Sequence, residues 1–155
     1  MFDIEAALNG MAELVRTVPA MESVGIGAPE SLSTRIAAWV TVGDPGEIGP
    51  REVGIYELPM NLIVWFGYAI GGAEGAAEAQ LADYISNLTM HIIQNRMNTV
   101  TGNAVTVTPN LNGAVARMEL PQAAAGVADY TLMAGEEART YPLGIRVIQR
   151  WNAGV

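Results

Sequence analysis

Apolar residues recur at helical spacing in two parts of the chain. Near the start, Asp3 is suited to cap a helix, and apolar positions then return every three or four residues until Pro19. This pattern predicts a helix over about residues 3–17. A longer pattern of the same kind predicts the longest helix of the chain, which begins at residue 72 or 73 and ends near residue 96.

Between these helices the pattern is typical of β-strands. The run "RIAAWVTV" at residues 35–42 predicts a buried strand that stops at the turn cluster "GDPGEIGP". Residues 52–57 form a short expected strand, and Pro59 separates it from the strongest β pattern of the chain, residues 61–69. Alternate residues of this last strand are apolar on both faces, which favours a central strand or one that packs on a partner.

After the long helix, three shorter β segments are expected: "NAVTVTP" from Asn103, "GAVARMEL" from Gly113 and "VADYTLM" from Val127. The "NLNG" sequence between the first two is a plausible hairpin connection. A final alternating strand, residues 140–151, is suited to pair with the central one.

The order of elements predicts an α+β fold in one domain spanning residues 1–155. We expect a mostly antiparallel β-sheet, flanked on one side by a short N-terminal helix and one long central helix, with a long β-hairpin.

Half of the 155 residues are hydrophobic and 15% are charged, so apolar surface is available for contacts between subunits. No stretch approaches 18 uninterrupted apolar residues, and no membrane span is expected. The start "MFDIEAAL" has no basic region, and therefore a secretory signal is not expected.

Sixteen acidic residues face eight basic ones, all arginines, and the net charge is -8. This charge opposes non-specific binding to nucleic acid, although it suits a protein that surrounds a DNA passage without gripping it. Lysine and cysteine are absent, which excludes a Walker lysine, a Schiff base, thiolate nucleophiles and disulfides.

Three glycines, Gly71, Gly72 and Gly75, lie where the central strand gives way to the long helix. Their spacing differs from the dinucleotide fingerprint, and no parallel β-α-β unit is expected after them. Glu74 and Glu78 stand in the first turns of the helix, where they complement its dipole but repel a phosphate. The glycines are therefore interpreted as a corner.

Other candidates for chemistry stand alone. His91, the single histidine, has apolar neighbours and is interpreted as a surface or interface residue. The pair Glu136 and Glu137 and the acids Asp44 and Glu47 are interpreted as loop charges, because no EF-hand or paired-carboxylate spacing is present. No catalytic, metal-binding or cofactor-binding residue is predicted, and the chain is not expected to be an enzyme.

The final strand carries a different signal. Arg146 and Arg150 share one face of it, and Trp151 follows on the other face. Arginine and tryptophan are favoured at protein interfaces, although an exposed sheet face with ordinary ion pairs explains them equally well. For Trp39 and Trp65 the same two interpretations apply, and the core is favoured over a contact surface.

The order of elements resembles the tail terminator proteins of long-tailed phages. The likeness rests on a helix with "ALNGMAELV", the strand "RIAAWVTV", a long hairpin ending in "NLIVWFGYAI", the helix "AEAQLADYISNLTMHII" and the final "YPLGIRVIQRW". It covers nearly the full chain as a pattern of elements and not as a signature motif.

The resemblance implies a ring, usually of six copies, on the last ring of the tail tube. Such a ring stops tube polymerisation, gives the head-tail connector or neck protein a docking surface and lets DNA pass. It implies assembly in the host cytoplasm, a place in the virion at the head-tail junction, and no catalysis or cofactor. Because ring contacts join two different patches, we expect the subunit interface at the hairpin and the final strand. The residues are Glu52, Val53, Ile55, Tyr56, Arg146, Arg150 and Trp151.

Three alternatives remain open from the sequence. Neck and head-closure subunits share the small α+β style and ring assembly. A small-molecule enzyme or ligand-binding domain would use a cleft beside Gly71. A subunit of a non-viral assembly is the third.

Overall fold

A computed structural model describes residues 2–33, 35–45, 48–71, 74–123, 128–131 and 137–153 of the chain. Its helices are α1 (Ile4–Arg16), α2 (Glu74–Asn95) and the short α3 (Pro109–Gly113). Its strands are β1 (Val24–Ile26), β2 (Ala37–Pro45), β3 (Gly49–Glu52), β4 (Ile55–Ala69), β5 (Val100–Gly102), β6 (Val105–Val107), β7 (Arg117–Met118), β8 (Gln122–Ala123), β9 (Ala128–Thr131) and β10 (Glu137–Asn152). This is the predicted α+β fold with a mostly antiparallel sheet.

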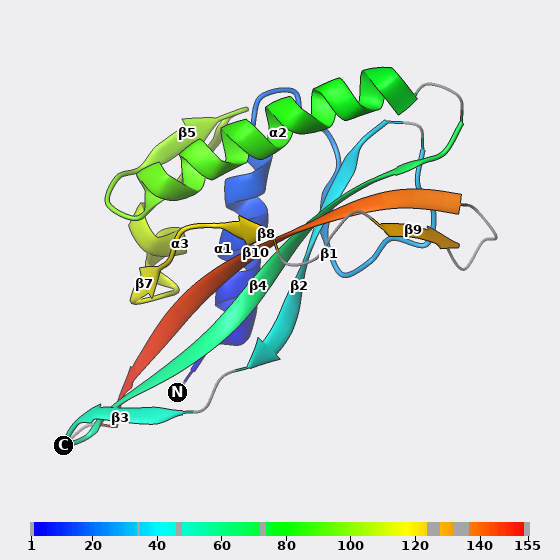
Figure 1. Cartoon of the computed structure of the whole chain (residues 1–155). Coiled ribbons are helices and arrows are strands. Elements are labelled where there is room, and N and C mark those ends of the chain that lie inside the picture. The colour runs from blue at the N-terminus through cyan, green and yellow to red at the C-terminus, as the bar shows by residue number, and fades with distance from the viewer. Residues whose placement is uncertain are drawn as a thin grey trace.

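The central pair of the sheet is β4 and β10, which run antiparallel over almost their whole length (Figure 1). β2 flanks β4 on the other side and carries β1, which pairs with it in parallel. Short strands β7, β8 and β9 line the outer edge of β10, and β3 pairs with the start of β4. The expected pairing of the final strand with the central one is therefore confirmed.

The main core lies between the sheet and the helices. Alternate residues of β4 enter it, namely Leu62, Val64, Phe66 and Tyr68, each at most 1% exposed. Buried residues of α1 and α2 meet them. Asp3 caps α1 as expected, because its carboxylate accepts a hydrogen bond from the Ala6 N–H at 3.0 Å.

The opposite face of the sheet is also apolar, as the two-sided pattern predicts. Trp39 and Trp65 are cross-strand partners whose rings stack at 6.4 Å between centroids, and Leu32 and Ala138 pack in the same cluster. A side chain at Gly67 would meet the Trp39 ring, since a Cβ there would lie 2.7 Å from it. Trp39 is core, as assigned, and Trp65 is half-buried beside it.

The expected break at Pro59 is wrong, because β4 runs through it from Ile55 to Ala69. Pairing of β2 with β4 ends at Met60, and pairing of β3 with β4 ends at Glu57. Pro59 lies in the gap between them. A strand tolerates proline where no neighbouring strand needs a hydrogen bond from the missing N–H. Pro59 meets this condition on the side of β4 that pairs with β2 and β3.

The expected hairpin at "NLNG" is also wrong. Asn110, Leu111 and Asn112 have φ of 57°, 56° and 60°, so α3 is a left-handed turn that leads from β6 to β7. β6 pairs instead with β5, and the hairpin turn between them is Asn103–Ala104, both at positive φ. The expected strands from Asn103 and Gly113 therefore shrink to the three residues of β6 and the two of β7.

A buried asparagine explains how the left-handed turn is held. Asn95 at the end of α2 is fully buried, and its Oδ1 accepts a hydrogen bond from the Leu111 N–H at 2.9 Å. Its Nδ2 donates to the carbonyls of Val107 and Thr108, both at 3.0 Å. The long helix thus fixes the backbone of the following segment through one side chain.

Candidate functional site

Six of the seven residues predicted to form a subunit interface lie together at one end of the sheet. Residues 49–59 and 148–152, which we call the arm, extend past the start of α1 and away from α2 (Figure 1). Trp151 pairs with Tyr56, and Asn152 pairs with Ile55. The hairpin and the final strand, treated as separate regions in the sequence, are therefore adjacent strands of one surface. Arg146 lies further up the same strand, opposite Asn61.

The tip of the arm exposes apolar side chains. Val53 stands in the turn between β3 and β4 and is 89% exposed, next to Gly54, whose φ of 78° permits the tight turn. At the other end of the hairpin, the base of the arm, Ile48 just before β3 is 58% exposed. Glu52 at the end of β3 is exposed as well. The exposed Val53 at the end of a projecting hairpin is available for a contact with another protein.

The two faces of the arm differ in chemistry. On the face that continues the main core, Trp151 packs against Tyr56 with ring centroids 5.8 Å apart. Phe2 meets the edge of the same indole at 6.1 Å. This aromatic face ties the chain's first residues to its last strand, and Trp151 stays 39% exposed.

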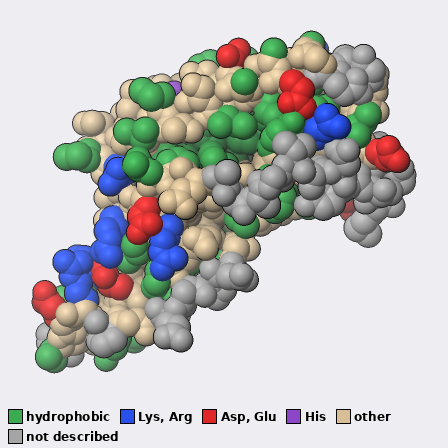
Figure 2. Space-filling view, viewed as in Figure 1, with side chains coloured by type: hydrophobic (Ala, Val, Ile, Leu, Met, Phe, Trp, Pro, Cys, Tyr) green, Lys and Arg blue, Asp and Glu red, His purple; other side chains and the backbone are tan. Residues whose placement is uncertain are grey.

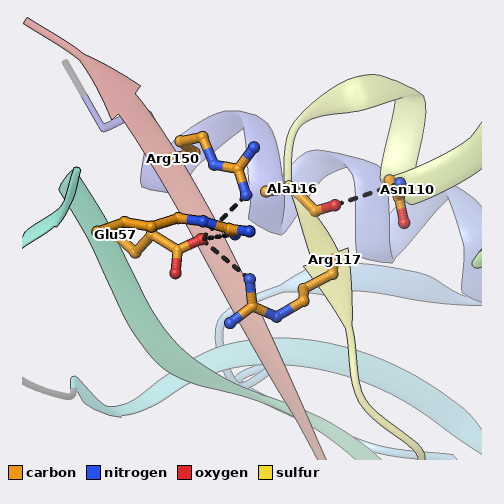
Figure 3. Close-up of polar contacts among 6 residues, drawn as sticks. Glu57, Asn110, Ala116, Arg117 and Arg150 are labelled. Carbon is orange, nitrogen blue, oxygen red and sulfur yellow. Dashed lines mark hydrogen bonds and ion pairs between the residues drawn. The ribbon is translucent and has the colours of Figure 1, made fainter. Parts of the chain in front are cut away.

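The other face carries three arginines around one carboxylate (Figure 3). Arg117 Nη1 lies 2.9 Å from Glu57 Oε2, and Arg51 Nη1 and Arg150 Nη2 each lie 3.2 Å from the same oxygen. We call these four residues the arginine cluster. The Glu57 side chain is 17% exposed, whereas the three arginine side chains are 42–49% exposed.

Strand register brings the arginine cluster together. Glu57 of β4 and Arg150 of β10 are cross-strand partners, and directly opposed residues of a ladder point to the same face. Arg117 of β7 is the partner of Ile148, two residues before Arg150, and so it lies on that face as well. Arg51 arrives from β3 across the hairpin.

The arginines set the charge state of Glu57. Hydrogen bonds from Arg117 in the first place, and from Arg150 and Arg51, hold the pKa of the carboxyl below its ordinary value of 4.5, although partial desolvation opposes them. Glu57 is therefore ionised at neutral pH and cancels one of three positive charges. Figure 2 shows arginine side chains gathered at this end of the molecule, with acidic ones among them.

The sequence reasoning found Arg150 but missed the partners that define its setting. The sequence pattern does not distinguish Arg51 and Arg117 from the other arginines, and it indicates Glu57 only as the end of a predicted strand. The alternation of "GAVARMEL" signals that Arg117 and Met118 face opposite ways, but which strand Arg117 joins depends on pairing. Arg146 is exposed on the same face of β10 and extends the positive surface along the strand.

A second polar cluster joins α2 to the sheet. Tyr141 Oη donates to both carboxylate oxygens of Glu78, at 2.5 and 2.6 Å, and Tyr68 Oη donates to Oε1 at 2.7 Å. Arg139 Nη1 lies 3.5 Å from the same oxygen. The hydrogen bonds from Tyr141 and then Tyr68 lower the Glu78 pKa, while burial and then Glu78 raise the pKa values of both tyrosines. Glu78 thus anchors the first half of α2.

His91 of α2 faces the end of α1. Its Nδ1 is 2.7 Å from Thr17 Oγ1, and that hydroxyl already donates to the Leu14 carbonyl at 2.6 Å. Since the hydroxyl has one proton, Nδ1 carries the hydrogen of this bond. Burial lowers the His91 pKa. The half-buried ring makes a contact between two helices of one chain, so the interpretation as a surface or interface residue is only partly right.

Those of the remaining predicted candidates that the structure describes do not gather into a site. Gly71 follows β4, and α2 begins at Glu74, so the glycine corner lies between a strand and a helix as expected; Gly72 lies outside the described residues. Glu136 and Glu47 also lie outside them. In the described part of the chain, no three His, Asp or Glu side chains could hold a metal ion, and no helix is long and apolar enough to cross a membrane.

Two hollows are lined by residues that the structure describes. One of about 540 Å³ lies between α1, α3 and the end of β10, and its lining includes Asn9, Glu13 and Gln149. The other, of about 330 Å³, includes Arg35 and Tyr84 in its lining. Gly71, beside which the ligand-binding alternative places a cleft, lines neither of these two hollows.

The sequence matches no protein-family model and no curated protein. The geometry of the arm is therefore the basis for assigning a function.

Proposed function

We propose that this chain is a structural subunit of a homo-oligomeric ring that ends a phage tail tube. In this role the arm of one copy contacts a different surface of the next, so that identical contacts close a ring. The ring would stop tube polymerisation and offer a docking surface to the head-tail connector. Assembly would take place in the host cytoplasm, and the mature position would be the head-tail junction of the virion.

The observation that carries this proposal is the arm itself. It reaches beyond the helix-covered body, it exposes Val53 and Trp151, and its other face holds the arginine cluster. Apolar and aromatic residues together with arginine are the composition of protein interfaces.

The charge of the chain supports the same role. A net charge of -8 disfavours tight binding to the phosphate backbone, so that DNA can slide through a ring built from this protein. The high apolar fraction for a chain of 155 residues is explained if part of that surface lies between subunits.

Native mass and tube length test the proposal. Light scattering of the purified chain, alone and with the tail tube protein, is expected to show one closed oligomer, and electron microscopy is expected to show tubes of limited length. Val53→Asp at the arm tip should abolish both effects. Met97→Asp is the matched control, because Met97 is 82% exposed at the far end of α2. A dimer as the final species would contradict the proposal. So would tubes whose length Val53→Asp limits as the wild type does.

Another head-tail connection protein is the nearest alternative, because a neck or head-closure subunit would use an arm in the same way. Antibody labelling of virions in the electron microscope separates the two: label at the tube end supports the terminator, and label on the connector supports the alternative.

A further inference from the structure

We infer that the arginine cluster is a socket for a carboxylate of a second copy of this chain. The inference rests on the proposed ring, and it names the chemistry of one half of the subunit contact. In the isolated subunit, Glu57 alone occupies the socket. In the ring, an acidic side chain of the neighbouring copy joins it.

The first argument is the number of donors around Glu57. Each guanidinium presents several N–H groups in a planar fork that matches the two oxygens of a carboxylate. Arg51, Arg117 and Arg150 all direct their contacts to Oε2 of Glu57. The arginines are 42–49% exposed, so the rest of their donors are within reach of a partner.

The second argument is the charge that remains. Three guanidiniums face one carboxylate, and Arg146 adds a further positive charge on the same strand face. The nearby acids Glu52 and Glu119 are exposed and only partly offset this excess. Covering the arginines with a neutral surface would desolvate charges without a partner, which is costly. An acidic group from the covering surface removes that cost.

Charge complementarity identifies the partner as a second copy. The arginines of this face are Arg51, Arg117, Arg146 and Arg150, and the acids beside them are Glu52, Glu57 and Glu119. When these residues are set aside, 13 of the 16 acids and four of the eight arginines remain. The rest of the chain is therefore strongly acidic. A ring brings this acidic surface of one copy against the arm of the next, because its contacts join different patches.

Glu57 gives the socket a distinctive signature. Its carboxylate competes with an incoming one for the same donors. Removal of the Glu57 charge should therefore strengthen binding of an external carboxylate, while removal of the arginines should weaken it. If the arginine cluster served only to stabilise the arm, removal of the Glu57 charge and removal of the arginines would both weaken binding of the external carboxylate.

The test measures binding of a short oligo-glutamate peptide at low salt by fluorescence anisotropy. Glu57→Gln is expected to tighten binding several-fold, and the double variant Arg117→Gln, Arg150→Gln to weaken it at least tenfold. Arg35→Gln, which removes a highly exposed arginine away from the arm, is the control and should bind as the wild type does. Circular dichroism establishes that each variant is folded, and Arg117→Gln alone serves if the double variant is not.

Weakening by Glu57→Gln, or absence of peptide binding to the wild type, would overturn the inference. So would tighter binding of a duplex DNA oligonucleotide of equal charge, because the partner would then be nucleic acid. Native mass separates this outcome from failure of the ring. If the wild type and the arginine variant both form rings, the socket is refuted and the proposed ring is not. A wild type that forms no ring with tube protein present refutes the proposed function.

Discussion

Glu57 and Arg150 lie opposite each other in the β4–β10 ladder, with Arg150 Nη2 3.2 Å from Glu57 Oε2. The arginine hydrogen bonds depress the pKa of Glu57 in the folded chain. A carboxyl with a depressed pKa stabilises the fold at pH values above its ordinary pKa of 4.5. This contribution is lost as the pH falls through the depressed value.

Glu57→Gln should therefore be less stable than the wild type at pH 7, and the difference should shrink toward zero as the pH is lowered well below 4.5. Denaturant unfolding across this range measures it. Glu22→Gln is the control, because Glu22 and Arg35 form an ion pair with side chains 73% and 80% exposed, and exposed pairs contribute little. A difference that is independent of pH would show that Glu57 acts through packing and not through its charge.

Tyr141→Phe should raise the pKa of Glu78, because it removes the strongest of the hydrogen bonds that lower it. We expect a loss of about 0.5–1 kcal/mol in unfolding free energy, which is less than for a buried bond to a charged group because Glu78 is partly exposed. The raised pKa of Tyr141 predicts that wild-type stability also declines as the pH rises above 10.0. Unfolding measured between neutral and alkaline pH checks both, with Tyr56→Phe as the control. Equal stability of Tyr141→Phe and the wild type would contradict this role.

Gly102→Ala should be strongly destabilising. A Cβ at this position would lie 2.1 Å from the Thr17 carbonyl oxygen, a backbone atom that cannot move aside without shifting the end of α1. We expect a loss of about 3 kcal/mol or more, the upper range for overpacking. Gly75→Ala is the matched control: a Cβ there meets nothing within 4 Å, and the change should stabilise α2 by about 0.5–1 kcal/mol. Thermal melts compare the two, and similar melting temperatures would be evidence against the close contact of β5 with α1.

In Asn95→Ala, the segment after α2 should unfold more easily than in the wild type. It leaves the Leu111 N–H and the carbonyls of Val107 and Thr108 without their buried partner, at a cost of about 2–4 kcal/mol. Hydrogen exchange at Leu111 should accelerate with the loss of global stability. Gln94→Ala, one residue earlier and exposed, is expected to change little. Unaltered exchange at Leu111 in Asn95→Ala would refute the role of Asn95.

The sequence by itself determined the features that depend on neighbouring residues. Helical spacing and the Asp3 cap placed α1, and the two-sided apolar pattern of residues 61–69 identified the central strand before any partner was known. Both follow from which side chains share a face, which local periodicity controls.

Only the tertiary structure decided the features that depend on distant partners. Pro59 is accommodated because the strand pairings on either side leave a gap at its position. The left-handed turn at "NLNG" forms because Asn95, in another element, supplies its hydrogen bonds. The arginine cluster exists because the ladder sets Arg150 opposite Glu57, 93 residues away in the sequence. No local pattern encodes such a register, since it is selected by the packing of the whole sheet.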